Sequence, residues 1–121
     1  MKGRTPNTQE KRWHDLIASH IGCLPCLKDH KARNTHVSIH HIDGRTKPDA
    51  HWLVLGLCAG HHQRGHGLPG QLAIHGDKRP HERRYGTERE QLAMATEQLL
   101  EMGMSVPPRV FELVGLQEAA A

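Results

Sequence analysis

The sequence predicts a small α+β domain that bound zinc holds together. Two β-rich runs flank a turn-rich segment, stretches with helical periodicity lie outside them, and two pairs of metal-ligand residues bracket the runs. With 121 residues, 36% of them hydrophobic, such a chain buries only about 60–70% of its unfolded surface, and a metal is a common supplement to so thin a core. We expect one domain over residues 1–121, with its core at about 23–100 and a C-terminal tail at 104–121.

A helix is predicted near the N-terminus, over residues 8–20. Asn7 is a suitable N-cap, and Glu10 three residues later completes the pattern of a capping box. The apolar residues that follow recur near helical spacing: Trp13, Leu16, Ile17 and Ile21. Gly22 should end this helix, and residues 23–34 are expected to form an irregular knuckle.

Two strands are predicted next. In the segment HVSIHHI, Val37 and Ile39 alternate with polar residues, and WLVLGL is a run of leucine and β-branched residues. The intervening DGRTKPDA contains Asp-Gly and Lys-Pro, both of which favour turns. The two strands should therefore pair as a hairpin with a long loop.

The C-terminal half is predicted to be mainly helical. A short helix should run from about residue 59 to 66, followed by an extended or looped segment over 72–86. Thr87 and Glu90 then form a second capping box at the start of a clear amphipathic helix that Gly103 ends. A proline pair introduces one further short helix in the tail.

Two half-sites predict a structural zinc site. Cys-x-x-Cys precedes the hairpin and Cys-x-x-His follows it, which gives four ligands of the kind that tetrahedral zinc prefers: Cys23, Cys26, Cys58 and His61. His30 or His36 could replace His61. The alternatives are buried free cysteines or a Cys-x-x-Cys redox pair, whereas an odd total of three cysteines disfavours a disulfide framework.

The remaining histidines indicate a second metal ion. His62 and His66 are four residues apart, so they share one face of a helix. His40 and His41 are neighbours on a strand and should point to opposite sides. We therefore expect His40, His62 and His66 to hold an ion while His41 acts as a base, a combination suited to phosphodiester hydrolysis. The alternative is a second structural zinc site or a solvated histidine-rich surface.

The net charge of +3 and the pI of about 9 make an anionic partner plausible. Arg45 and Lys47 lie in the loop beside His41 and are the expected phosphate contacts nearest the chemistry, although ordinary solvated charge is an equally good reading for each alone. A basic track would continue through Arg79, Arg83 and Arg84. Because no apolar stretch suggests a membrane span or a signal peptide, we expect no membrane partner and a cytoplasmic location.

Two stretches resemble a known family. The pattern HHIDG…H…LCAGHHQRGHG resembles the HNH endonucleases, also called ββα-metal or His-Me finger nucleases. Together with IHGDKRPHERRYGTEREQL, the region from about Cys23 to Leu100 is similar to the phage recombination-enhancement (Ref), RecA-dependent nucleases. The resemblance implies a ββα-metal core in which His40 binds the ion and His41 is the general base. His51 would orient that base or support the loop, and as a histidine in place of the commoner asparagine it could instead bind metal or phosphate.

The resemblance also implies an activity and partners. The chain would be a metal-dependent DNA endonuclease of phage or prophage recombination in the bacterial host cytoplasm, leaving 5′-phosphate and 3′-hydroxyl ends. Its catalytic ion would be Mg²⁺ or Mn²⁺, or Zn²⁺ as isolated, beside the structural Zn²⁺, and a RecA-type filament would be a second partner. The rival reading is a zinc-stabilised nucleic-acid-binding accessory protein that does not cut. For His75, in the matching IHG segment, a structural hydrogen bond is the favoured role.

Overall fold

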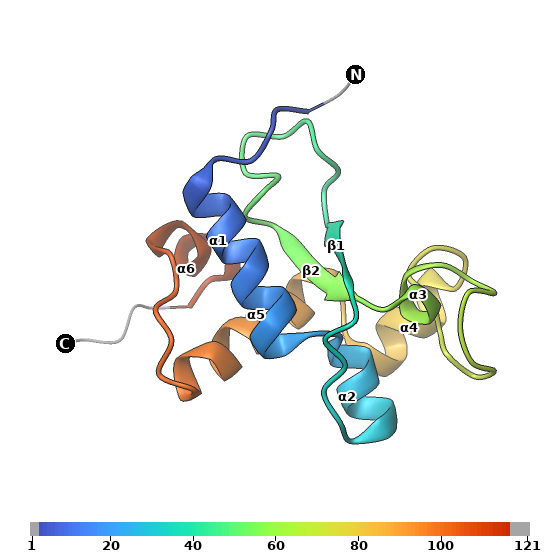
Figure 1. Cartoon of the computed structure of the whole chain (residues 1–121). Coiled ribbons are helices and arrows are strands. Elements are labelled where there is room, and N and C mark those ends of the chain that lie inside the picture. Colours follow the sequence, from blue (N-terminus) through green and yellow to red (C-terminus); the bar gives the residue numbers. More distant parts are fainter. Residues whose placement is uncertain (1–2, 117–121) are drawn as a thin grey trace.

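The computed structural model describes residues 3–116 and contains a two-stranded antiparallel sheet with helices around it (Figure 1). The chain order of the elements is α1 (Thr8–Leu16), the π-helix η1 (Ile17–Ile21), α2 (Leu24–His30), β1 (Ser38–His41), β2 (Val54–Leu57), α3 (Ala59–His62), α4 (Lys78–Tyr85), α5 (Glu88–Glu101) and α6 (Pro108–Val114). Figure 1 shows α1 and α6 on one side of the hairpin and α3 and α4 on the other. The predicted α+β class is thus confirmed at the level of a small sheet with flanking helices.

The predicted hairpin is confirmed, with a loop over residues 42–53. His40 pairs with Leu55 and His41 with Val54. Residues opposite each other in an antiparallel pair project to the same face, and successive residues project to opposite faces. The end of β1 therefore directs two adjacent imidazoles to different sides of the sheet.

The N-terminal helix begins at the predicted capping box, in which Asn7 and Glu10 exchange hydrogen bonds. Its last turn widens into η1, and Gly22 then ends it with a φ of 69°. A Cβ at Gly22 would lie 2.3 Å from the Asn34 carbonyl oxygen, so only glycine fits this approach. The turn delivers the chain directly to Cys23, which forms an isolated bridge with Gly56 of β2.

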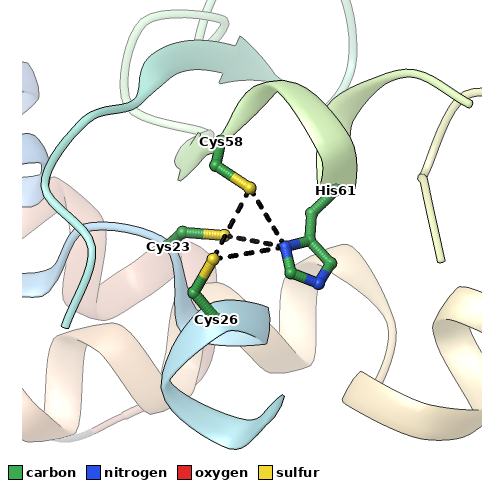
Figure 2. Close-up of side chains that lie close together, drawn as sticks. All are labelled: Cys23, Cys26, Cys58 and His61. Carbon is green, nitrogen blue, oxygen red and sulfur yellow. Dashed lines mark hydrogen bonds between the residues drawn. The ribbon is translucent and has the colours of Figure 1, made fainter. Parts of the chain in front are cut away.

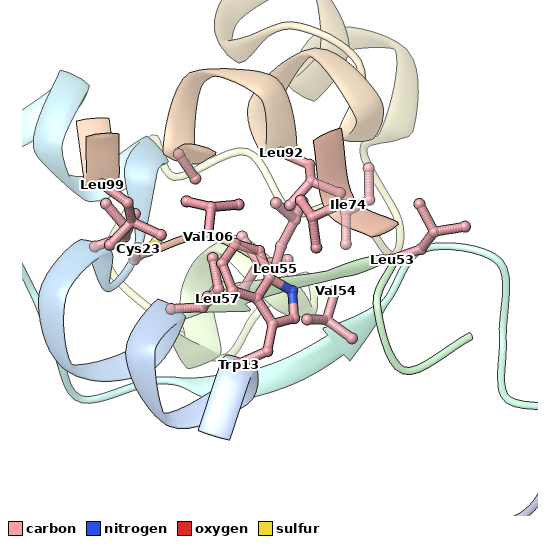
Figure 3. Packing of buried hydrophobic residues seen from close by; sticks show 14 of the residues in the cluster. Trp13, Cys23, Leu53, Val54, Leu55, Leu57, Ile74, Leu92, Leu99 and Val106 are labelled. Carbon is pink, nitrogen blue, oxygen red and sulfur yellow. The ribbon is translucent and has the colours of Figure 1, made fainter. Parts of the chain in front are cut away.

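The hydrophobic core packs between the sheet and the helices α1, η1, α5 and α6 (Figure 3). Trp13 is almost fully buried there, and its indole N–H donates to the Trp52 carbonyl oxygen at 3.1 Å. All four residues of β2 are buried. Apolar residues that the helices contribute to this core include Ile17, Ile21, Leu92, Leu99, Val110 and Phe111. The sheet and the long helix α5 thus share one core, which also includes Cys23, Cys26 and Cys58.

Three predicted segments need correction. Residues 24–30, expected to be irregular, form α2, and residues 78–85, expected to be extended or looped, form α4. The helix predicted over 59–66 stops at His62, because Gln63 has extended backbone angles and pairs with His75. The short helix expected in the tail is α6, and the last five residues of that tail lie outside the described part of the chain. No helix within residues 3–116 is long and apolar enough to cross a membrane.

Candidate metal and catalytic centres

One buried cluster combines three thiols with one imidazole (Figure 2). Nδ1 of His61 lies 3.5, 3.4 and 3.1 Å from the sulfur atoms of Cys23, Cys26 and Cys58, and the sulfur atoms of Cys26 and Cys58 are 3.5 Å apart. Tetrahedral zinc with Zn–S of about 2.3 Å would separate its ligand atoms by roughly 3.5–3.8 Å. The four side chains are therefore close to the spacing of a Cys₃His zinc site and could hold such an ion.

Backbone contacts explain how these residues meet. The bridge between Cys23 and Gly56 lays the end of η1 against β2, two residues before Cys58. A Cβ at Gly56 would lie 3.0 Å from the Gly22 carbonyl oxygen, so glycine permits the close approach. Cys26 lies in the first turn of α2, and His61 lies one turn into α3 from Cys58. Both half-sites thus consist of a residue at a helix start and a residue one turn later.

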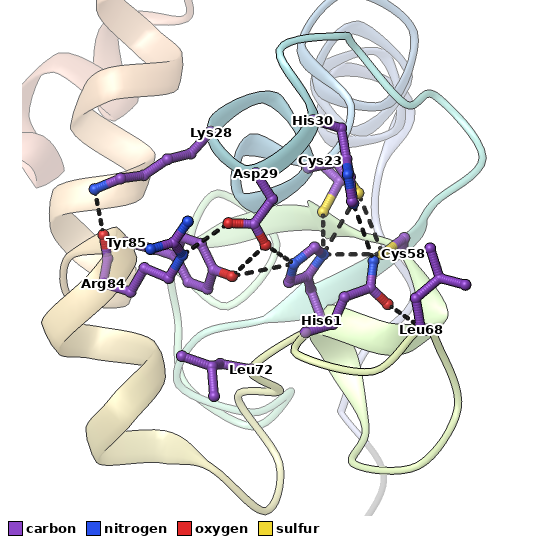
Figure 4. A network of polar contacts seen from close by, with 12 residues as sticks. Cys23, Lys28, Asp29, His30, Cys58, His61, Leu68, Leu72, Arg84 and Tyr85 are labelled. Atoms are coloured by element: carbon purple, nitrogen blue, oxygen red, sulfur yellow. Dashed lines mark hydrogen bonds and ion pairs between the residues drawn. The ribbon is translucent and has the colours of Figure 1, made fainter.

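A polar network fixes the imidazole of the cluster (Figure 4). Nε2 of His61 donates to the Asp29 carboxylate at 3.0 Å, which leaves Nδ1 with the lone pair that faces the sulfur atoms. The same carboxylate accepts from the Tyr85 hydroxyl at 2.5 Å and from the Arg84 guanidinium at 2.8 Å. Burial opposes ionisation of Asp29, but these donors lower its pKa to about 2. A carboxylate behind a ligating histidine is the usual partner that sets its tautomer.

The three cysteines of the cluster are also suited to binding a cation. Burial raises the pKa of Cys23 and of Cys26, so the thiolate forms need a positive charge nearby. The side-chain amide of Asn34 donates to the sulfur of Cys26 at 3.5 Å, a contact that favours the thiolate. None of the three cysteines forms a disulfide. His30 and His36, the alternatives to His61, are both exposed and lie outside the cluster.

A second cluster consists of His40, His62 and His75, each with one ring nitrogen within 4.8 Å of the others. The rings of His62 and His75 lie 5.1 and 5.3 Å from that of His40, centroid to centroid. Nε2 of His40 donates to the Glu88 carboxylate at 2.7 Å. A histidine held by a carboxylate and surrounded by other imidazoles is typical of a metal ligand. Three imidazole ligands with room for further ligands suit zinc, nickel, cobalt or manganese.

The structure brings His75, and not the predicted His66, to this cluster. Because α3 ends at His62, the four-residue spacing no longer places His66 on the same helix face, and His66 lies exposed in a turn. His75 arrives through backbone pairing: its N–H donates to the His62 carbonyl oxygen at 3.0 Å, and its carbonyl accepts from Arg64 at the same distance. The segment after the loop therefore runs alongside the end of α3.

On the other side of β1, His41 meets His51. Nε2 of His51 donates to the backbone carbonyl of Arg4 at 2.6 Å, so in a neutral ring Nδ1 is the acceptor. That atom lies 3.1 Å from Nε2 of His41, which must then be the N–H donor. His41 keeps an unprotonated Nδ1, and burial together with the charge of Arg45 lowers its pKa to about 4. His41 is therefore a neutral imidazole of fixed tautomer near neutral pH.

A cavity of about 490 Å³ lies beside the end of β1. His40, His62 and His75 line it together with His41, and Arg45 and Lys78 supply positive charge at its wall. A neutral imidazole, a candidate metal cluster and two cations thus border one open space. That combination can bind an anion and activate a water beside it.

The other predicted basic residues are more scattered. Lys47 is exposed in the hairpin loop, and Arg79 and Arg83 are exposed on α4. Arg84 contacts Asp29 and the Tyr85 ring instead of extending the basic track, so it belongs to the network behind His61. Lys78 lines the cavity but was not among the predicted residues, because α4 was not predicted either.

Sequence reasoning also missed Asp29, Tyr85, Glu88, His14 and the position of His75. No spacing rule connects His75 with His62 across twelve intervening residues. The only sequence indication of a role for His75 was its place in the IHG segment that resembles the nuclease family. Asp29 lies three residues after Cys26, and a carboxylate close to a ligand pair is a recognisable partner for a ligating histidine. The partners of His40 and His61 on α4 and α5 could be found only in three dimensions.

A family model described as recombination enhancement, RecA-dependent nuclease, matches residues 6–100 of the chain. The match covers most of the sequence. It includes the cysteine cluster, both histidine groups and the helices α4 and α5 that carry their carboxylate and hydroxyl partners.

Proposed function

Because the chain belongs to the family of recombination-enhancement, RecA-dependent nucleases, we propose that it is a metal-dependent DNA endonuclease of the HNH type. It hydrolyses phosphodiester bonds in phage or prophage DNA recombination, and it acts with a RecA-type filament. The observation that carries this proposal is the cavity that His41 lines together with His40, His62 and His75.

His40, His62 and His75 are the proposed ligands of the catalytic ion, with His75 taking the role first assigned to His66. Three observations support this assignment: the three side chains are imidazoles whose nitrogens lie close together, His40 donates a hydrogen bond to Glu88, and an open cavity lies beside them. When bound, a divalent ion supplies a Lewis acid that stabilises charge on the scissile phosphate and on the departing 3′ oxygen. Imidazole ligands favour Zn²⁺ or Mn²⁺ over Mg²⁺ in the purified protein.

His41 is the proposed general base. Its Nδ1 takes a proton from a water as the water oxygen attacks phosphorus and the bond from phosphorus to the 3′ oxygen breaks. His51 is a positioning residue, because its Nδ1 accepts the N–H of His41 and so keeps the proton off the reacting nitrogen. The carbonyl of Arg4 sets the tautomer of His51 in turn. This chain of hydrogen bonds supports the role of orienting the base that the sequence left open.

DNA phosphates are proposed to bind first at Arg45 and Lys78, which border the cavity. Arg79 and Arg83 on the exposed surface of α4 and Lys47 in the hairpin loop could extend the contact, whereas Arg84 serves the zinc side. Contacts of this kind are sequence-independent and weaken steeply with salt. The cluster of Cys23, Cys26, Cys58 and His61 is proposed to hold a structural Zn²⁺ that contributes to folding.

The test is a cleavage assay with supercoiled plasmid and single-stranded DNA over Mg²⁺, Mn²⁺ and Zn²⁺, with and without RecA and ATP. Under the proposal, the wild-type protein cuts in at least one metal and the cut is stimulated by the RecA filament. His41→Ala should lower the rate by about 10²–10⁴-fold, the usual contribution of a general base, while DNA binding persists.

His66→Ala is the matched control, because it removes an exposed histidine of the same segment that contacts neither cluster. It should cut like the wild type. DNA binding with no cleavage in any metal, with or without RecA, would favour the non-catalytic accessory protein. Cleavage that survives in His41→Ala would refute the assignment of the base.

A further inference from the structure

A third group of ring nitrogens lies on the side of β1 away from His40. His14 of α1, His41 at the end of β1 and His51 in the hairpin loop each place one nitrogen within 4.8 Å of the other two. The ring of His41 lies 5.9 Å from that of His14 and 5.1 Å from that of His51, centroid to centroid. The proposed reaction uses His41 and His51, but it leaves His14 without a role.

We propose that His14, His41 and His51 form an inhibitory binding site for Zn²⁺, separate from the catalytic ion. The inference rests on the proposed function, because its consequence is the loss of the base. Zinc at Nε2 of His41 displaces the proton that this nitrogen donates to His51 in the metal-free protein. The neutral ring then carries its proton on Nδ1, the nitrogen that would otherwise accept a proton from water. Excess Zn²⁺ would therefore inhibit cleavage that Mg²⁺ or Mn²⁺ supports.

Backbone carbonyls orient two of the three rings. Nε2 of His51 donates to the Arg4 carbonyl at 2.6 Å, and Nε2 of His14 lies 2.7 Å from the carbonyl oxygen of His51. A neutral imidazole that donates one N–H keeps a lone pair on its other nitrogen, and a carbonyl behind the ring is a common partner of metal-binding histidines. Nε2 of His41 and Nδ1 of His51, which share a hydrogen bond without metal, are 3.1 Å apart, close to the roughly 3.3 Å between two nitrogen ligands of tetrahedral zinc, so an ion could replace the shared proton.

The donor set and the surrounding charges predict the strength and the selectivity of the site. Three imidazoles and no thiolate bind zinc more weakly than the Cys₃His cluster, and the nearby charge of Arg45 opposes a cation at His41. The negative charges of Glu10 and Asp15 near His14 favour a cation there, although Glu10 is itself paired with Arg4. Mg²⁺ prefers oxygen ligands and should not occupy this site. The site should therefore fill only after the two other clusters.

The test counts bound zinc in the full chain. Equilibrium dialysis against ZnCl₂ should give one fewer equivalent in His14→Gln than in the wild type, because the glutamine keeps an N–H for the His51 carbonyl but lacks a ring nitrogen. His20→Gln is the matched control, since His20 is exposed on η1 and outside the group. It should bind as many equivalents as the wild type. In ¹⁵N NMR, the last wild-type equivalent should shift the ring nitrogens of His41 and His51.

The cleavage assay supplies the second readout. In saturating Mg²⁺ or Mn²⁺, added ZnCl₂ should inhibit the wild type at a concentration at least about tenfold lower than for His14→Gln, and a chelator should restore the rate. Equal zinc counts in the two proteins, or unchanged ring signals of His41 and His51, would overturn the site. A lower count in His14→Gln with no cleavage by either protein would uphold the zinc site and refute the nuclease. Cleavage by both proteins with equal numbers of bound zinc ions would uphold the nuclease and refute the zinc site.

Discussion

The cysteine cluster and the His40 cluster differ in how completely the protein encloses them. The four residues of the first are buried and touch one another, and Asp29, Tyr85 and Arg84 hold its imidazole from behind. In the second, His40 is buried, His62 is half-buried and His75 is exposed beside a cavity of about 490 Å³. Four protein ligands close a tetrahedral site, whereas three leave a position for water or substrate.

We infer from this difference that the two sites have distinct tasks, although the short helix α3 contributes a histidine to each. His61 and His62 are neighbours in α3, yet their rings belong to different clusters because successive helical residues point about 100° apart. We infer that the closed cluster contributes to folding and that the open one contributes to chemistry. Each of the following variants tests one side of this contrast.

The largest expected effect is on the closed site. Cys26→Ser removes one of four ligands and should cost folding free energy on the order of several kcal/mol, because zinc binding and folding are coupled. Zinc content by atomic emission and thermal unfolding by circular dichroism measure the loss. His30→Ala, an exposed change in the same helix, is the control. A Cys26→Ser protein with full zinc content and unchanged unfolding would show that the cluster is not a zinc site.

On the open side, His75→Ala should lower cleavage by about 100-fold or more while the structural zinc and the melting temperature are retained. The reason is that it removes a proposed ligand of the catalytic ion, and even changes behind such ligands cost 10–100-fold. His66→Ala should stay within about twofold of the wild type. The opposite result, a loss of cleavage in His66→Ala but not in His75→Ala, would identify His66 as the third ligand of the catalytic ion.

A smaller effect is expected behind the closed site. Tyr85→Phe removes the hydroxyl that donates to Asp29 and should weaken zinc retention by about tenfold, measured by competition with a chromophoric chelator. Cleavage in the zinc-loaded protein should remain close to that of the wild type. A variant that loses cleavage but keeps its zinc would mean that the two clusters are not separate in function.

The smallest expected effect is on stability, and it concerns the ion pair of Arg4 and Glu10 that lies behind His51. Arg4, whose carbonyl holds His51, forms a two-fold hydrogen-bonded pair with the nearly fully buried Glu10. This pairing lowers the pKa of Glu10 from 4.5 to about 2. Because the folded pKa is the lower one, the associated stability is present above pH 4.5 and is lost as the pH falls toward 2.

Glu10→Gln should therefore lower the free energy of unfolding by about 1 kcal/mol at pH 7, a value reduced because Arg4 is half exposed. The difference from the wild type should shrink between pH 4.5 and 2. Urea unfolding of both proteins at a series of pH values measures it. A difference that is constant with pH would exclude ionised Glu10 as its source.

Much of the local structure could be predicted from sequence because its causes are local. The capping boxes of Asn7 with Glu10 and of Thr87 with Glu90 define two helix starts, and both are present. The hairpin followed from alternation and turn residues. In contrast, α4 was missed because Pro80 and several charged residues mask a helix that buries only His81 and Tyr85. Its length and position depend on packing against α2 and not on its own periodicity.

The sequence by itself predicted most of the candidate metal ligands, since paired cysteines and histidines at short spacing indicate ligands wherever the chain folds. It also determined that His40 and His41 separate, because a strand alternates its side chains. Only the tertiary structure decided between His66 and His75, and only it placed Asp29 behind His61 and the Arg4 carbonyl behind His51. These contacts depend on where α3 ends and on which segments pair across loops. Both are set by long-range packing of the chain and not by local sequence.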